Sequence, residues 1–273
     1  MTMALHKWLF VIGLVIWCIQ KGQAQIELPW SIDVISDGTI AMRFEKEIRL
    51  YNEDLQLLDI FVIIPAEEPI TIGEMEWSPD GQYVAISTYP GNKLQLWKYP
   101  QKIKVFEREA FSIINIVWSR DSQMFTTLNW RRVGSELFTY RLNGFIEREW
   151  RTRLGLGRSD WYSPNNVLVV PGRSINILDV TNFQEMQTLS ITAVDPGISF
   201  NEAGNQMAFV SSLPDGSTNI LQIWSYQNRS FEHFRTLTGH TRMIDDFAWH
   251  DNLIATYNLA LEASDDTIQV WNA

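Results

Sequence analysis

The amino-acid sequence predicts an all-β fold built from repeated four-stranded units. Six segments alternate apolar and polar side chains as short strands do, and most of them end in an aromatic residue. They are residues 48–51, 94–97, 136–138, 175–178, 221–224 and 267–271. Polar turns stand at Asp37, Asp80, Asp121, Asn165, Ala203 and Asp251, in steps of 43, 41, 44, 38 and 48 residues. That period fits a four-stranded blade, so we predict a β-propeller of six blades.

Each repeat is expected to contribute four antiparallel strands that run from a central axis to an outer edge. The strand after each turn is apolar, as at residues 83–88, whereas the last strand of a repeat is more polar. These last strands are predicted at residues 57–64, 102–109, 144–150, 185–191 and 231–237. Charged side chains on an open sheet edge discourage pairing with other chains, so we assign these segments to the rim.

The sixth repeat has three predicted strands and no fourth. Residues 25–30 precede the first repeat and have no other predicted partner. We therefore expect this N-terminal strand to form the missing outer strand and to close the ring, with Pro29 tolerated at an edge. The alternatives are a seven-bladed ring or a chain truncated within a larger propeller.

The first 24 residues have the layout of a secretory signal peptide. Lys7 precedes an apolar run of twelve residues, 8–19, and small residues at Gly22 and Ala24 precede a possible cleavage site. Twelve residues are too few for a membrane-spanning helix, which needs roughly twenty. We expect cleavage after Ala24, a secreted or periplasmic location, and a single propeller domain over residues 25–273. The alternative is an uncleaved membrane anchor.

Cysteine content and charge exclude several classes of function for the cleaved chain. Cys18 is the only cysteine, so cleavage would leave no disulfide, no thiol nucleophile and no cysteine ligand for zinc. Loss of Lys7 and Lys21 would leave 20 basic residues against 32 acidic ones, a net charge of −12. Such a chain is a poor ligand for nucleic acid or for an anionic membrane. We expect neither partner, and we expect a monomer.

No motif in the chain points to catalysis, a metal or a cofactor. His233, His240 and His250 show neither a His-Glu-x-x-His motif nor the spacing that would make two of them converge on zinc. Residues 154–158 contain Gly-x-Gly without the further glycine or lysine of a phosphate loop. Asp245 and Asp246 are adjacent, so in a strand they point to opposite faces. We expect no catalytic residue, metal or cofactor.

The last repeat resembles a WD repeat. The resemblance lies in Gly239-His240-Thr241, in residues 247–249 (Phe-Ala-Trp) and in residues 264–271 (Ser-Asp-Asp-Thr-Ile-Gln-Val-Trp). In that family four residues form a hydrogen-bonded chain within a blade, and the resemblance implies this role for His240, Thr256, Asp265 and Trp271. The second and fifth repeats keep the tryptophan, as Trp97 and Trp224, but lack the histidine. WD-repeat propellers commonly have seven blades, which leaves the blade number open.

Loops at one end of the predicted strands carry a candidate surface for a partner. In an antiparallel blade the loops between the second and third strands emerge on the same face as those between blades. The candidate residues on that face are Tyr89, Trp130, Arg131, Arg132, Arg158, Leu213, Leu259 and Leu261. Residues 131–158 hold seven arginines against three acids, and arginine beside exposed tryptophan is typical of an interface hot spot. The alternative is that these side chains fold back onto the rim or scatter as ordinary surface.

These observations predict a secreted or periplasmic propeller that serves as a noncatalytic scaffold for another protein. The scaffold role is what the WD-repeat resemblance implies. The alternative is an extracytoplasmic enzyme or small-molecule-binding propeller with its site at the axial mouth, since propeller active sites use scattered residues that a sequence does not reveal.

Overall fold

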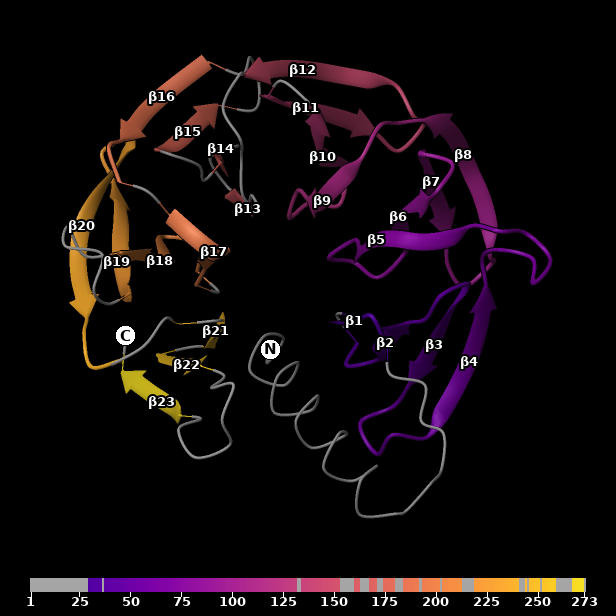
Figure 1. Ribbon diagram of the computed structural model, residues 1–273, viewed down its shortest axis with the longest axis horizontal. Helices are drawn as coiled ribbons and strands as arrows, with labels where there is room; N and C mark the ends of the chain where they lie inside the picture. Colours follow the sequence, from indigo (N-terminus) through magenta and orange to yellow (C-terminus); the bar gives the residue numbers. More distant parts are fainter. Residues whose placement is uncertain are drawn as a thin grey trace. The chain divides into compact units, whose positions relative to one another are not determined.

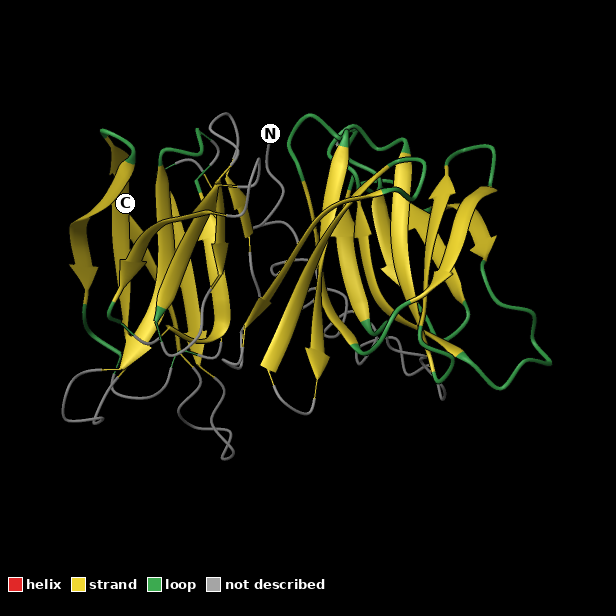
Figure 2. Ribbon diagram, turned by 90° about the horizontal axis from the view of Figure 1, so that it is seen from above, coloured by secondary structure: helices red, strands yellow, loops and turns green. Residues whose placement is uncertain are grey.

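The computed structural model describes residues 29–272, with gaps (Figure 1). The gaps are residues 36, 132–133, 153–159, 163–166, 171–173, 180–183, 192, 202, 213–218, 241–243, 245, 251 and 259–266. Within the described ranges the regular elements are all strands, joined by turns and loops (Figure 2). Accordingly, none of these residues forms a helix that could cross a membrane.

The first three sheets have four strands each, in the described part of the chain. The first contains β1 Ser31–Val34, β2 Ile40–Arg43, β3 Glu47–Tyr51 and β4 Leu57–Val62. The second contains β5 Thr71–Trp77, β6 Tyr83–Tyr89, β7 Lys93–Lys98 and β8 Ile103–Glu109. The third contains β9 Ile113–Trp118, β10 Met124–Arg131, β11 Gly134–Arg141 and β12 Ile146–Thr152.

The next two sheets also have four strands, and the last described sheet has three. The fourth contains β13 Asp160–Tyr162, β14 Val167–Val170, β15 Ile175–Asp179 and β16 Gln184–Leu189. The fifth contains β17 Ala193–Phe200, β18 Gln206–Ser212, β19 Asn219–Gln227 and β20 Ser230–Leu237. The sixth contains β21 Asp246–His250, β22 Leu253–Asn258 and β23 Thr267–Asn272. The prediction of an all-β fold of repeated four-stranded antiparallel sheets is confirmed, whereas the number of blades stays a prediction.

Turn chemistry explains why the first two strands of a repeat form a hairpin. In the turn after β5, the hydroxyl of Ser78 donates to Asp80 Oδ1 at 2.6 Å and accepts from the Tyr83 N–H at 2.9 Å. Gly81 has φ +71°, a conformation that glycine adopts at no steric cost. The turn after β9 repeats this arrangement, because Ser119 donates to Asp121 Oδ1 at 2.6 Å. The periodic turns of the sequence are therefore hairpin turns with side-chain locks.

The chain divides into two compact units, and the boundary runs through the third sheet. One unit comprises residues 1–129 and 139–147, and the other comprises residues 130–138 and 148–273. The first unit has a buried core that includes Ile48, Phe61, Trp77 and Ile86. The second unit has two buried clusters, one around Phe209 and Phe231 and the other around Trp249 and Ile254. Each unit therefore buries an apolar core of its own, while the single propeller domain over residues 25–273 stays a prediction.

The predicted polarity of the outer strands is wrong for β4. Leu57, Leu58, Ile60 and Val62 are 50%, 57%, 41% and 58% exposed, and Phe61 faces the core. A register shift opposite Leu50 and Tyr51 adds one residue to β4 and bends the edge. The outer position of this strand is set by its main-chain pairing with β3. The polarity of its side chains does not determine that pairing, so polarity was a poor guide to the strand's position. The prediction holds better for β8, which exposes Lys104, Glu107 and Glu109.

The predicted closing strand needs one correction. The main-chain N–H of Trp30 donates to the carbonyl of Arg43 at 2.8 Å, so Trp30 extends β1 alongside β2 in the first sheet. The Arg43 guanidinium also lies 5.8 Å from the centre of the Trp30 ring. Trp30 therefore belongs to an inner strand because its backbone partner lies there. Residues 25–28 lie outside the described residues, and their role in closing the ring stays a prediction.

Candidate functional site

Three of the four residues implied by the WD-repeat resemblance form a hydrogen-bonded chain in the sixth sheet. Thr256 Oγ1 is hydrogen-bonded to His240 Nε2, and the Trp271 indole N–H donates to the same oxygen at 3.0 Å. Thr256 is 1% exposed and His240 is 7% exposed. The pairing of Ile254 with Trp271 and of Thr256 with Gln269 sets this geometry. Asp265 lies outside the described residues.

The buried imidazole of His240 has one nitrogen without a partner among the described residues. Nδ1 is buried and accepts or donates no hydrogen bond there. Burial lowers the pKa of His240, so the ring is neutral at pH 7 and carries one proton. When Thr256 donates to Nε2, that proton lies on Nδ1 and needs an acceptor. A carboxylate beside Nδ1 is the role that the resemblance implies for Asp265.

Glutamine replaces the threonine as the acceptor of the tryptophan N–H in two other sheets. Trp97 donates to Gln95 Oε1 at 2.9 Å, and Trp224 donates to Gln222 Oε1 at 3.0 Å. The β-sheet register explains the change. Ile86 and Phe209 occupy the places opposite Gln95 and Gln222 that Thr256 occupies opposite Gln269. Without a hydroxyl at that position of the neighbouring strand, the side chain two residues before the tryptophan accepts the indole N–H.

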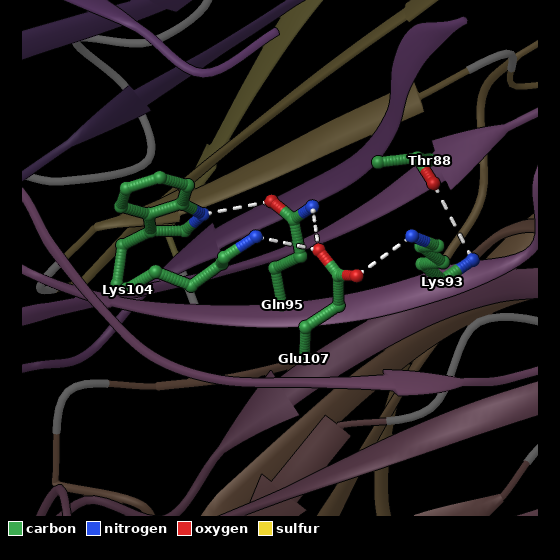
Figure 3. Close-up of polar contacts among 6 residues, drawn as sticks. Thr88, Lys93, Gln95, Lys104 and Glu107 are labelled. Atoms are coloured by element: carbon green, nitrogen blue, oxygen red, sulfur yellow. Dashed lines mark hydrogen bonds and ion pairs between the residues drawn. The ribbon is translucent and has the colours of Figure 1, made fainter.

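Glu107 completes the glutamine arrangement in the second sheet (Figure 3). Its carboxylate accepts from Gln95 Nε2 at 2.8 Å, from Lys104 Nζ at 2.7 Å and from Lys93 Nζ at 2.7 Å. The hydrogen bonds from Lys104 and then from Lys93 lower the pKa of Glu107 to about 2. Trp97 also packs edge-on against Phe61, with ring centres 5.3 Å apart. We name Lys93, Gln95, Trp97, Lys104 and Glu107 the tryptophan clip, and its contacts are those of a structural element.

The structure places three of the eight predicted partner-face residues in strands, and the other five lie outside the described residues. Tyr89 ends β6 and is 69% exposed, and Trp130 is 54% exposed. Trp130 and Arg131 were predicted in a loop, but they belong to β10, which continues past the pairing of Asn129 with Ile113. Arg132, Arg158, Leu213, Leu259 and Leu261 lie outside the described residues.

A second exposed aromatic residue, which the sequence analysis missed, lies at the same end of the second sheet as Tyr89. Phe111 is 56% exposed and follows β8 by two residues. Tyr89 pairs with Thr71, Thr88 with Lys93, and Lys93 with Glu109, which brings these strand ends together. The rule that loops between blades share this face could have identified Phe111, because it lies directly between two predicted strands.

Exposed acidic residues surround these two aromatic residues. Glu67 and Glu68 lie in the loop before β5, and Glu109 ends β8. Glu45 lies in the turn between β2 and β3, and its carbonyl accepts from the Ile72 N–H at 2.7 Å, which places it beside β5. We name Glu45, Glu67, Glu68, Tyr89, Glu109 and Phe111 the acidic aromatic end.

Hydrogen bonds from side chains to main-chain carbonyls hold the acidic aromatic end in place. The Thr71 hydroxyl donates to the Tyr89 carbonyl at 3.0 Å, and Asn129 Nδ2 donates to the Phe111 carbonyl at 2.9 Å. Lys46 Nζ donates to the carbonyls of Ala66 and Glu68 at 2.5 and 2.6 Å, which fixes the loop that carries Glu67. The surface is therefore pre-organised, and a ligand would lose little entropy by ordering it.

The part of the chain that the structure describes contains no group of three or more histidine, cysteine, aspartate or glutamate side chains that could hold a metal ion. The His240 chain is buried, and the carboxylate of the tryptophan clip is already paired with two lysines and a glutamine. The acidic aromatic end combines two exposed rings with exposed carboxylates on a backbone that hydrogen bonds hold in place.

Comparison with known proteins gives sequence relatives but no match to a protein-family model. The chain is 34% identical over 86 residues to the protein transport protein sec13 of Aspergillus oryzae, covering 31% of this chain and 26% of that protein. It is 25% identical over 250 residues to the anaphase-promoting complex subunit cdc20 of Dictyostelium discoideum, covering 90% of this chain. The chain spans 39% of that second relative's length, so neither relative is matched over most of its sequence.

The fold has close counterparts among solved structures. The crystal structure of the C-terminal WD40 domain of Sif2 superposes with a TM-score of 0.62 at 15% sequence identity, over 86% of this chain and 66% of that one. At this level of identity the similarity shows the fold alone. Together with the two sequence relatives and the strand order of the sheets, it supports the resemblance of this chain to WD-repeat β-propellers, from which its sequence has diverged.

Proposed function

We propose that this protein is a noncatalytic platform that binds another protein through the loop ends of its strands. The observation that carries the proposal is the 69% exposure of Tyr89 on a backbone that Thr71 fixes. Large aromatic residues are enriched among the residues that dominate binding energy in protein interfaces. The similarity to a protein named as a subunit of the anaphase-promoting complex supports the same class of function.

Each of the two units offers an exposed aromatic anchor. Tyr89 and Phe111 belong to the first unit, and Trp130 belongs to the second. An exposed ring loses little conformational entropy on binding because it has few rotatable bonds, and it buries a large apolar area. A partner that covered one of these rings would gain apolar burial without any rearrangement of the sheets beneath it.

The proposal includes an extracytoplasmic location, which the N-terminal sequence supports. Lys7, the apolar run 8–19 and Ala24 have the order of a cleavable signal peptide. N-terminal sequencing of the protein isolated from its native host tests this part. A first residue of Gln25 is expected, and retention of the leader in a cytoplasmic fraction would contradict it.

Cross-linking in the native host tests the platform function. Wild-type protein is compared with Tyr89→Ala, with Trp130→Ala and with Phe234→Ala, which removes a ring that is 56% exposed on β20 and serves as the control. We expect a specific partner to be lost from the Tyr89 or Trp130 variant and kept by the control. Identical partners for all four proteins, each with an unchanged melting temperature, would refute the proposal.

A further inference from the structure

The distribution of paired and unpaired carboxylates distinguishes the acidic aromatic end from the neighbouring rim. On the rim, Glu47, Asp59 and Glu107 form salt bridges with Arg49, Lys102 and the lysines of the tryptophan clip. In contrast, the carboxylates of Glu67, Glu68 and Glu109 form no salt bridge with any described residue. Three exposed anionic groups thus remain available beside two exposed rings.

The cations near this end are already occupied. Lys46 donates to two main-chain carbonyls, and Lys93 donates to Glu107, which Lys104 also contacts. The carboxylates of Glu45, Glu67, Glu68 and Glu109 therefore outnumber the ammonium groups of Lys46 and Lys93, and Lys93 is already paired with Glu107, which lies outside this set. Among the described residues this end therefore carries more carboxylates than ammonium groups, an excess that would attract basic ligands and repel acidic ones.

We propose that the acidic aromatic end binds a basic segment of the partner protein in which arginine or lysine alternates with apolar side chains. This inference rests on the proposed function and specifies the chemistry of the partner. The carboxylates of Glu67, Glu68 and Glu109 pair with the guanidinium or ammonium groups. The rings of Tyr89 and Phe111 contact the apolar side chains and attract a cation over their faces.

The spacing of the surface matches an extended segment. Tyr89 and Glu109 end strands that are two positions apart in the sheet, because β7 lies between β6 and β8. Neighbouring strands are about 4.8 Å apart, so these strand ends are about 10 Å apart. Alternate side chains of an extended peptide point the same way and repeat about every 7 Å, so a short segment can contact a ring and a carboxylate together.

Binding of synthetic peptides to the full chain tests the inference. The probes are three fluorescein-labelled octapeptides, one alternating arginine and leucine, one alternating glutamate and leucine, and one alternating arginine and serine. Fluorescence anisotropy should show binding of the arginine–leucine peptide at least about tenfold tighter than binding of the glutamate–leucine peptide. The arginine–serine peptide should bind with intermediate affinity, because it keeps the charge and loses the apolar contact.

Variants of the surface assign this binding to particular side chains. Glu67→Gln, Glu68→Gln and Glu109→Gln combined should weaken the arginine–leucine peptide by about three- to tenfold and flatten its salt dependence. Tyr89→Ala with Phe111→Ala should weaken it by about tenfold. Glu232→Gln with Phe234→Ala removes an exposed acid and an exposed ring of β20, and this matched control should leave the affinity unchanged.

Two results would overturn the inference. One is equal binding of the arginine–leucine and glutamate–leucine peptides, and the other is equal weakening by the surface and control variants. A third result would overturn the inference and leave the proposed function standing. If the Tyr89 variant loses the native partner while the triple glutamine variant keeps it with full affinity, the platform stands and the basic partner segment is wrong.

Discussion

Two regions of the second sheet use the same kinds of side chain for different purposes. In the tryptophan clip, the Glu107 carboxylate accepts from two lysines and a glutamine, and the Trp97 ring is half-buried against Phe61. At the acidic aromatic end, Glu67, Glu68 and Glu109 have no salt bridge among the described residues, and Tyr89 and Phe111 are exposed. The difference shows how a structural acidic residue differs from one that can bind another protein. The carboxylate of the structural residue already has hydrogen-bond and salt-bridge partners within the fold, whereas the other carboxylate has no salt bridge with any residue that the structure describes.

The largest expected effect comes from removing the ring at the centre of the clip. Trp97→Ala deletes a partly buried aromatic side chain and leaves a space beside Phe61, so the free energy of unfolding should fall by about 3 kcal/mol. Chemical denaturation followed by circular dichroism measures the change. Phe234→Ala, which removes an exposed ring, is the control and should cost less than about 0.5 kcal/mol. Equal effects of the two variants would show that the clip is not a structural element.

The next effect concerns Thr256, which accepts the tryptophan N–H in the sixth sheet. In the second and fifth sheets a glutamine has this role. Thr256→Val keeps the size of the side chain but removes the hydroxyl shared by His240 and Trp271, so two buried groups lose their partner. The free energy of unfolding should fall by about 2 kcal/mol. Gln95→Leu is the corresponding change in the second sheet and should have a similar cost. A Thr256→Val protein with the same free energy of unfolding as the wild type would contradict the structural role assigned to this chain of hydrogen bonds.

A smaller effect concerns the acid of the clip and depends on pH. The pKa of Glu107 falls from an ordinary value of 4.5 to about 2 in the folded protein, so its stabilisation is fully present above pH 4.5. This contribution is lost as the pH falls from 4.5 towards 2, and solvent screening limits it to about 1 kcal/mol. Denaturation of wild type and Glu107→Gln should therefore differ at pH 6 and converge near pH 2. A difference that stays constant over this range would refute the assignment.

The sequence predicted the fold better than the surface. The turn residues around Asp80 and Asp121 and the alternation around Trp97 and Trp271 identified the repeated sheets, because these signals are local. Strand β4 was predicted at the outer edge, but its exposed side chains are apolar and not polar as expected, since its place follows from pairing with β3. The inner position of Trp30 was also missed, because it depends on a hydrogen bond to Arg43 thirteen residues away.

The sequence predicted only part of the candidate site, because local signals do not show which distant residues lie together in the fold. Tyr89 was identified from a loop rule, but the acidic residues around it come from two connections between strands and from the end of β8. Their grouping depends on the pairing of Lys93 with Glu109 and on the bond between Ile72 and Glu45. A sequence shows which residues are acidic, but it does not show which of them have a lysine within reach.

The most direct test of the comparison measures stability and binding together on one pair of variants. Thermal unfolding and cross-linking to the native partner are recorded for Tyr89→Ala with Phe111→Ala and for Glu107→Gln. The first protein should keep its melting temperature and lose the partner, and the second should lose stability at pH 6 and keep the partner. Loss of the partner by the Glu107 variant alone, with both rings at the acidic aromatic end dispensable, would contradict the account.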